Sequence, residues 1–98
     1  MGANEVELVA RVSVQDVTPS ISKALGLKDA RGALVGDVTP GSPASKSGIE
    51  RGDVIVEANK RSVTSVSEFE RAVRRTVDGM MLLLINRRGS TIYVAVES

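Results

Sequence analysis

The sequence predicts an α+β, mainly β fold: a small, partly open antiparallel β-barrel of five or six strands capped by two or three helices. Short runs of β-branched and aliphatic residues are separated by turns rich in Gly and Pro, which is typical of strands in a small sheet. Helix start and stop signals lie in two of the breaks, and a longer helical pattern lies near the C-terminal end. The expected order is therefore strand, helix, strand, helix, strand, helix, strand, strand.

Length and composition bound the class of protein. The chain has 98 residues, enough for one domain with one modest core, and its 42% apolar and 26% charged content is typical of a globular domain. Phe69 and Tyr93 are the only aromatic residues, so the core is expected to be aliphatic. A net charge of +1 gives no reason to expect nucleic acid as a partner, and no apolar run is long enough for membrane insertion.

The absence of His and Cys from the sequence narrows the chemistry further. A Ser-His-Asp triad, a Cys-His pair, a disulfide and the usual zinc sites all need residues that this chain lacks. Ser42 follows a glycine as nucleophilic serines often do, but its position before Pro43 favours a helix cap. We therefore expect no catalytic residues, no cofactor and no metal.

The N-terminal third contains two strand patterns and a short helix pattern. Apolar residues fall on even positions from Val6 to Val14, which predicts one half-buried strand over that range. Thr18 and Pro19 are typical of a helix start and Gly26 of its end. The inner face of this helix is expected to consist of Ile21, Ala24 and Leu25. Gly32 to Val38 is predicted as the next strand.

The segment from Thr39 to Lys60 is the most informative part of the chain. Pro40-Gly41 predicts a turn, Ser42 a helix N-cap and Gly48 a left-handed helix end. Gly52-Asp53 then turns the chain into a predicted buried strand that begins at Val54-Ile55-Val56, and a turn follows at Asn59-Lys60.

The last third contains the strongest helix pattern. Ser65 and Glu68 form a capping-box pair at the start of a helix predicted from Val66 to about Arg75. Strands are predicted from Met80 to Asn86 and from Thr91 to Glu97. The residues that share one helix stripe are Val66, Phe69, Ala72 and Val73.

A hairpin turn, Arg87-Arg88-Gly89-Ser90, joins these two strands, with Gly89 able to take a positive φ. We interpret both arginines as a solvated hairpin tip.

The segment Ile49-Glu50-Arg51-Gly52-Asp53-Val54-Ile55, with Gly32–Val35 before it and Val12–Pro19 at the start, closely resembles a PDZ domain. The form is that of the bacterial HtrA/DegP-type (DegP-, DegQ- or MucD-like) serine proteases, in which a PDZ module follows the protease domain. The resemblance runs from about Leu8 to Val96 and implies a PDZ-like barrel with the permuted bacterial strand order, in which the peptide-binding strand comes first. It leaves open whether this is a first or second PDZ domain of its parent.

In such a domain an extended peptide adds as one more strand between a strand, here Val12 to Gln15, and a helix, here Val66 to Arg74. A loop just before the strand holds the ligand's C-terminal carboxylate. Arg11 stands in that loop where the family has a glycine, so it could narrow the loop or supply a positive charge. The peptide-binding residues that the resemblance implies are Ala10, Arg11, Val12, Ser13, Val14, Gln15, Val66, Phe69, Glu70 and Val73. Taken singly, the apolar members also fit plain core positions.

The resemblance implies a non-catalytic module that binds extended or C-terminal peptides of unfolded proteins, and so recruits substrate to a periplasmic serine protease or regulates it. The alternatives are a degenerate groove that acts in oligomer assembly or docks on the protease domain, or a PDZ domain of another membrane- or secretion-associated protein. Residues 1–5 are expected to be a flexible start, with Met1-Gly2 as an added leader, and residues 6–98 the PDZ domain.

Overall fold

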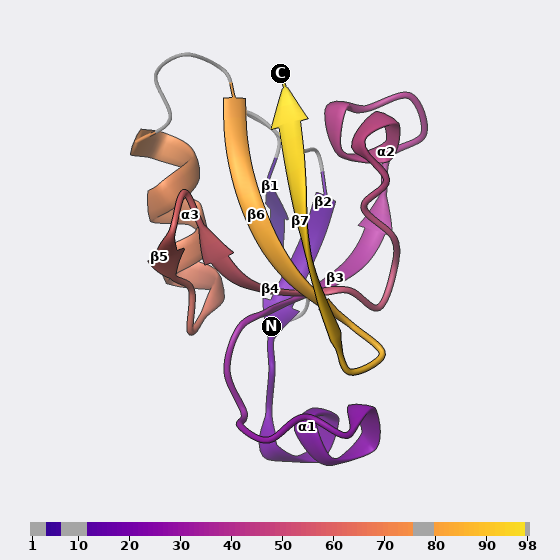
Figure 1. The fold of residues 1–98 in the computed structure, drawn as a ribbon, viewed down its shortest axis with the longest axis vertical. Helices are drawn as coiled ribbons and strands as arrows, with labels where there is room; N and C mark the ends of the chain where they lie inside the picture. The colour runs from indigo at the N-terminus through magenta and orange to yellow at the C-terminus, as the bar shows by residue number, and fades with distance from the viewer. Residues whose placement is uncertain (1–3, 7–11, 76–79, 98) are drawn as a thin grey trace.

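The computed structural model describes residues 4–6, 12–75 and 80–97, which contain seven strands and three helices (Figure 1). In chain order these are β1 (Asn4–Val6), β2 (Val12–Asp16), α1 (Pro19–Leu25), β3 (Ala33–Val38), α2 (Pro43–Ser47), β4 (Val54–Ala58), β5 (Arg61–Ser62), α3 (Val66–Arg75), β6 (Met80–Arg87) and β7 (Ser90–Glu97).

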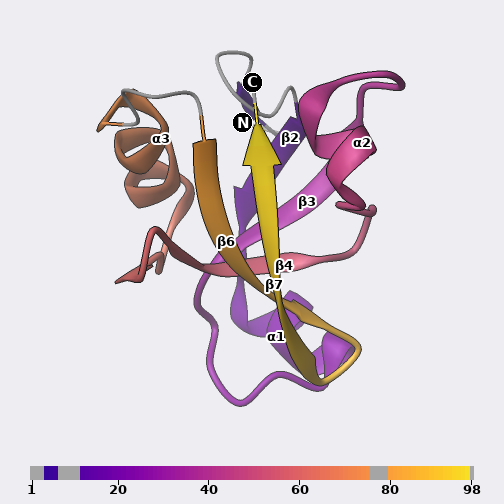
Figure 2. The ribbon, with the colours of Figure 1, turned by 45° about the horizontal axis from the view of Figure 1, so that its top comes forward.

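The strands form one antiparallel sheet in the order β1-β2-β3-β4-β6-β7, with the two-residue β5 paired to β4. Figure 2 shows β6 and β7 in front of β2 and β3, with β4 crossing between the two halves. In the described part of the chain the end strands β1 and β7 do not pair with each other, so the curled sheet stays open. This confirms the predicted mainly β, partly open architecture and its three helices.

The N-terminal strand prediction is wrong in one respect. The alternating residues from Val6 to Val14 do not form one strand, because Val6 lies in β1 and pairs with Val12 of β2. Antiparallel pairing puts these two residues on different strands. Period-two alternation does not show where one strand ends and the next begins, since two consecutive strands can both carry it.

The core lies between the two halves of the sheet and under α3. Phe69 is completely buried and is its only aromatic residue among those described, whereas Tyr93 is 60% exposed, so the expected aliphatic core is confirmed. The buried apolar residues of this cluster are Val12, Val14, Ala33, Val35, Ala44, Ile49, Ile55, Ala58, Val63, Val66, Phe69, Val73, Met81, Leu83, Ile85, Val94 and Val96.

Both short helices begin and end where the sequence predicts. The Ser42 hydroxyl accepts a hydrogen bond of 3.3 Å from the Ser45 N–H, and Gly48 closes α2 with φ of 95°. Ser42 is therefore a buried cap, as expected from Pro43. Thr18 caps α1 in the same way through the Ile21 N–H. No helix in the described residues has the length and apolar character needed to cross a membrane.

The predicted inner face of α1 is wrong for two of its three residues. Ile21 is half-buried, but Ala24 is exposed and Leu25 is 40% exposed, whereas Ser22 is buried. The Ser22 hydroxyl lies within hydrogen-bond distance of the carbonyls of Leu27 and Asp29, at 3.2 and 3.0 Å. The seven-residue α1 lies apart from the sheet core in Figure 1, so its inward side closes the loop that follows it rather than packing on the core.

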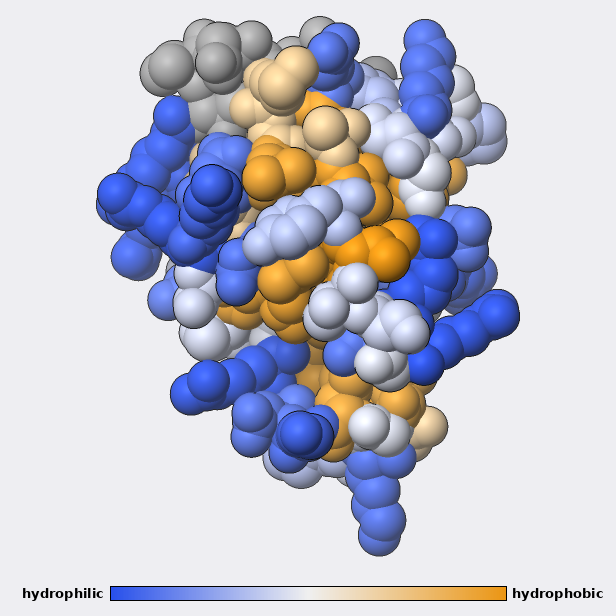
Figure 3. Space-filling model, in the orientation of Figure 1, coloured by the Kyte–Doolittle hydropathy of each residue, from blue (hydrophilic) through white to orange (hydrophobic). Residues whose placement is uncertain are grey.

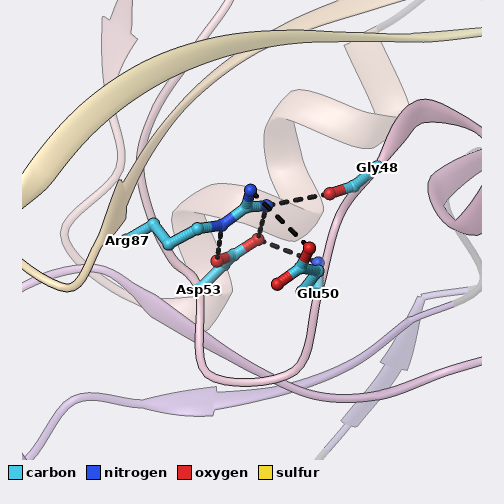
Figure 4. Close-up of polar contacts among 4 residues, drawn as sticks. All are labelled: Gly48, Glu50, Asp53 and Arg87. Carbon is cyan, nitrogen blue, oxygen red and sulfur yellow. Dashed lines mark hydrogen bonds and ion pairs between the residues drawn. The ribbon is translucent and has the colours of Figure 1, made fainter.

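The buried carboxylate of Asp53 connects the segment from Thr39 to Lys60 to the hairpin formed by β6 and β7 (Figure 4). Asp53 is 1% exposed, and its two carboxylate oxygens accept hydrogen bonds of 2.8 Å each from Nε and one Nη of Arg87. The same Arg87 nitrogen donates to the Gly48 carbonyl at 2.8 Å, and the Glu50 N–H donates to Asp53 at 2.9 Å. Hydrogen bonding to Asp53 raises the pKa of Arg87 above its usual value.

The interpretation of Arg87 as a solvated hairpin tip is therefore wrong. Its side chain is 29% exposed and reaches back across the end of β6, whereas Arg88, the next residue, is exposed at the turn. A bidentate fork suits arginine better than lysine, because the guanidinium presents parallel donors to a carboxylate.

Outside the core, β6 and β7 carry an apolar outer face. Met80 is 47% exposed, and Leu82 and Leu84 are half-buried. Tyr93 and Ala95 lie directly opposite Leu84 and Leu82 on β7. Figure 3 shows apolar side chains gathered over the front of these strands.

We expect Ile55→Ala to lower the free energy of unfolding by about 3 kcal/mol, because Ile55 is fully buried in β4 and truncation leaves a cavity. Chemical denaturation measures this loss. Ile92→Ala is the matched control, since Ile92 is 37% exposed and should cost under about 1 kcal/mol. An equally small loss for Ile55→Ala would show that β4 is not a core strand.

We expect Arg87→Ala to lower the free energy of unfolding by about 3 kcal/mol, because it leaves the Asp53 carboxylate buried without its cation. Arg88→Ala removes the same charge one residue away and should cost little. Denaturation of the two variants compares them directly, and similar losses would show that the buried pair does not stabilise the fold.

Candidate functional site

The candidate site lies where β2 runs beside α3. The two elements are far apart in sequence, and a hydrogen bond joins their ends: the Val66 N–H, at the start of α3, donates to the Asp16 carboxylate, at the end of β2, over 2.7 Å. A carboxylate is favourable at this point because the first N–H groups of a helix lack partners within the helix. This contact sets the position of α3 relative to β2.

The capping box that the sequence predicts is present in altered form. The Ser65 hydroxyl accepts from the Glu68 N–H at 3.3 Å, as expected. The Glu68 carboxylate, however, accepts from the N–H and hydroxyl of Thr64 rather than from the Ser65 N–H. These hydrogen bonds, the hydroxyl's first, lower the pKa of Glu68 from its usual value. Thr64, Ser65 and Asp16 together fix where α3 begins.

The α3 residues predicted for the site divide into two groups. Val66, Phe69 and Val73 are buried in the core cluster, with Phe69 fully enclosed. Glu70 is half-buried and lies one turn from both Val66 and Val73. The helix thus offers an aliphatic stripe with one carboxylate at its margin.

The β2 residues alternate as a half-buried strand should. Val12 and Val14 are buried, and Ser13 and Gln15 are half-buried. Asp16, which completes the strand, is exposed apart from its bond to α3. Val12 and Val14 therefore occupy core positions.

The Ser13 side chain hydrogen-bonds across a bulge between β2 and β3. The pairing of β2 with β3 shifts register between Val12 and Val14, and at this bulge the Asp37 N–H donates to the Ser13 hydroxyl at 2.8 Å. A Cβ on Gly36 would come within 2.8 Å of the same hydroxyl oxygen, so a glycine is needed opposite the bulge. The sequence did not indicate this role of Ser13. Its hydroxyl faces β3.

Ala10 and Arg11, the predicted carboxylate-loop residues, lie outside the described residues. Asp16 is the residue at the candidate site that the sequence did not indicate. The sequence shows only an acidic residue at the end of a predicted strand, and the partner of Asp16, Val66, lies 50 residues further along the chain.

A hollow of about 370 Å³ is lined by residues outside β2 and α3. Val54, Val56 and Val63 line its apolar part, and Lys28 and Arg31 its polar part. No cluster of three or more potential metal-ligating side chains occurs among the residues that the structure describes.

The candidate site consists of β2, the second strand of an open sheet, with α3 alongside it, an arrangement typical of small modules that bind peptides by strand addition. The PDZ domain family model matches residues 34–87, more than half of the chain. The chain belongs to the PDZ domain family, and its sequence matches the PDZ regions of DegP/HtrA-type serine proteases.

Two curated relatives illustrate the match. A "Probable periplasmic serine endoprotease DegP-like" of Hahella chejuensis is 40% identical over 88% of this chain and 19% of its own length. The protein of the same name from Chlamydia trachomatis is 35% identical over 89% of this chain and 18% of its own length. The chain thus spans under a fifth of these relatives, and the catalytic domain to which their names refer is not in it.

Solved structures agree with this assignment. The HtrA3 PDZ domain bound to a phage-derived ligand (FGRWV) has a TM-score of 0.78 at 26% identity, covering 98% of this chain and 88% of that one. The HtrA-type protease AlgW with a decapeptide has a TM-score of 0.76 at 26% identity, covering 97% of this chain and 29% of that one. The predicted family, fold and non-catalytic character are therefore confirmed.

We expect Asp16→Ala to lower the free energy of unfolding by about 1 kcal/mol, because it removes a side-chain acceptor at a helix start. Amide exchange at Val66 should accelerate more than exchange at the core strands. Asp37→Ala is the control: Asp37 pairs with Arg51 at 3.6 Å, and both side chains are over 80% exposed, so it should change little. Unchanged exchange at Val66 in Asp16→Ala would contradict the proposed link between β2 and α3.

Proposed function

We propose that this PDZ domain binds extended or C-terminal peptides of unfolded proteins by adding them as a strand to β2, beside α3. The observation that carries this proposal is the link between Asp16 and Val66, which holds a helix along the strand whose edge would accept the peptide. Two structural neighbours have peptide ligands in their descriptions, which supports the same role here. Main-chain pairing would give register, and the side chains nearby would give selectivity.

The proposed site consists of the peptide-binding residues named from the sequence. The walls named from the sequence are Val12, Val14, Val66 and Val73, all aliphatic and of moderate size, and each is at most 5% exposed in this structure. Such walls favour Val, Leu, Ile or Ala near the peptide C-terminus over bulky polar groups. Because the patch is small and the peptide must become ordered, we expect affinity no tighter than micromolar, about −8 kcal/mol.

The parent protein would use this binding to recruit substrate to an HtrA-type serine protease or to regulate it. The curated relatives are named as periplasmic endoproteases, so we extend a periplasmic location to this chain. We propose residues 6–98 as the domain, and β1 places Asn4 and Glu5 in contact with it. Docking to the protease domain or to neighbouring subunits is the second candidate role, which the apolar outer face of β6 and β7 favours.

Arg11 determines how the carboxylate of a bound peptide is treated. If the positive charge of Arg11 attracts the peptide carboxylate, amidation of the peptide C-terminus and added salt should both weaken binding. If its side chain obstructs the loop, amidation should have no effect and Arg11→Gly should strengthen binding.

We expect a free-acid peptide ending in valine to shift the NMR signals of β2 and α3 when titrated into the protein. The amidated peptide is the matched control for the free carboxylate. Arg88→Ala is the matched control for Arg11→Gly, because it also removes one positive charge. Shifts confined to the outer face of β6 and β7 would overturn binding at β2 and favour docking instead.

A further inference from the structure

The edge of β2 that a peptide would need is already paired. One edge of β2 pairs with β3, and the other pairs with β1. In the latter pairing Asn4 lies opposite Val14, Glu5 opposite Ser13 and Val6 opposite Val12. A strand has only two edges, so a peptide adding to β2 must take the place of Asn4–Val6.

The direction of β1 is also that of the proposed ligand. β1 runs antiparallel to β2, and its last residue, Val6, lies opposite Val12 at the start of β2. A peptide whose C-terminal carboxylate lies at the loop before Val12 must run antiparallel to β2 as well, with its C-terminal end toward Val12. The backbone of Asn4–Val6 therefore has the position and polarity expected of the last residues of a bound peptide.

We propose that Asn4–Val6 is an internal competitor that closes the peptide site until a ligand displaces it. This inference rests on the proposed peptide-binding function and adds regulation of that same site. Since Asn4–Val6 is covalently tethered close to β2, it competes at a high effective concentration. The apparent dissociation constant of a peptide then equals its intrinsic value divided by the fraction of molecules in which β1 has left the edge.

The competitor is short enough to be displaced. Only three residue pairs join β1 to β2, and isolated two-stranded pairing of this length is marginal in water. The contacts that position α3, from Asp16 and Ser65, do not involve β1 and can persist when it leaves. A peptide that adds a longer strand and also contacts α3 can therefore replace it.

The test compares variants of the complete chain. Glu5→Pro removes the N–H and fixes φ at the centre of β1, so it should weaken the pairing. Glu5→Val removes the same charge but favours a strand, so it is the matched control. A third variant lacks residues 1–6. We titrate each with one eight-residue free-acid peptide ending in valine, and expect about tenfold tighter binding for Glu5→Pro and the deletion, and equal or weaker binding for Glu5→Val.

Hydrogen exchange without peptide gives an independent measurement. Amides of β2 that are not bonded to β3 should lose protection in Glu5→Pro and in the deletion, but not in Glu5→Val. If the peptide binds all variants equally and exchange is unchanged, the competitor role of β1 is overturned while the proposed peptide binding stands. If the peptide binds none of them, the proposed function and the competition both fail. Thermal unfolding verifies that each variant folds. If the deletion variant does not fold, the comparison of Glu5→Pro with Glu5→Val still decides the test.

Discussion

The fold depends on one buried ion pair, Asp53 with Arg87. Asp53 stands at the turn between α2 and β4, and Arg87 at the end of β6. A buried carboxylate is tolerated only when its oxygens are bonded, and here both accept from one guanidinium while the Glu50 N–H supplies a third bond. Because Arg87 also donates to the carbonyl of Gly48, one side chain joins the helix end, the turn and the hairpin.

That junction determines where the site can form. The Gly52 N–H donates to the Val35 carbonyl, and the Val35 N–H donates to the Asp53 carbonyl, so the same turn holds β3 against the start of β4. β3 in turn pairs with β2, and Ser13 closes the bulge between them through the Asp37 N–H. β2 thus reaches α3 in a defined position, which allows Asp16 to meet the start of the helix. The proposed site does not contact the ion pair directly. It depends on the ion pair because the turn at Asp53 positions β3, which in turn positions β2.

The candidate site could be predicted in outline because its strand and helix carry local patterns. Val12 and Val14 follow strand alternation, and Val66, Phe69 and Val73 follow helix periodicity, so both faces could be assigned before the structure was known. Their burial shows that the same residues form part of the core. The contacts of Asp16 and Ser13 could not be predicted, since their partners, Val66 and Asp37, are distant in sequence. The pairing of Val6 with Val12 was missed because alternation does not show where one strand ends and the next begins.

Local sequence was enough to predict where several elements begin and end: the caps Thr18 and Ser42, the helix ends at Gly26 and Gly48, and the strand that contains Ile55. These depend on interactions within a few residues, where residue type limits φ, ψ and hydrogen bonding directly. Only the tertiary structure decided that Arg87 is a partner of Asp53, that Leu25 is exposed, and that β1 lies on the edge of β2. Each of these depends on which distant segment lies alongside, and nothing in the local chemistry of arginine, leucine or a three-residue strand specifies that neighbour.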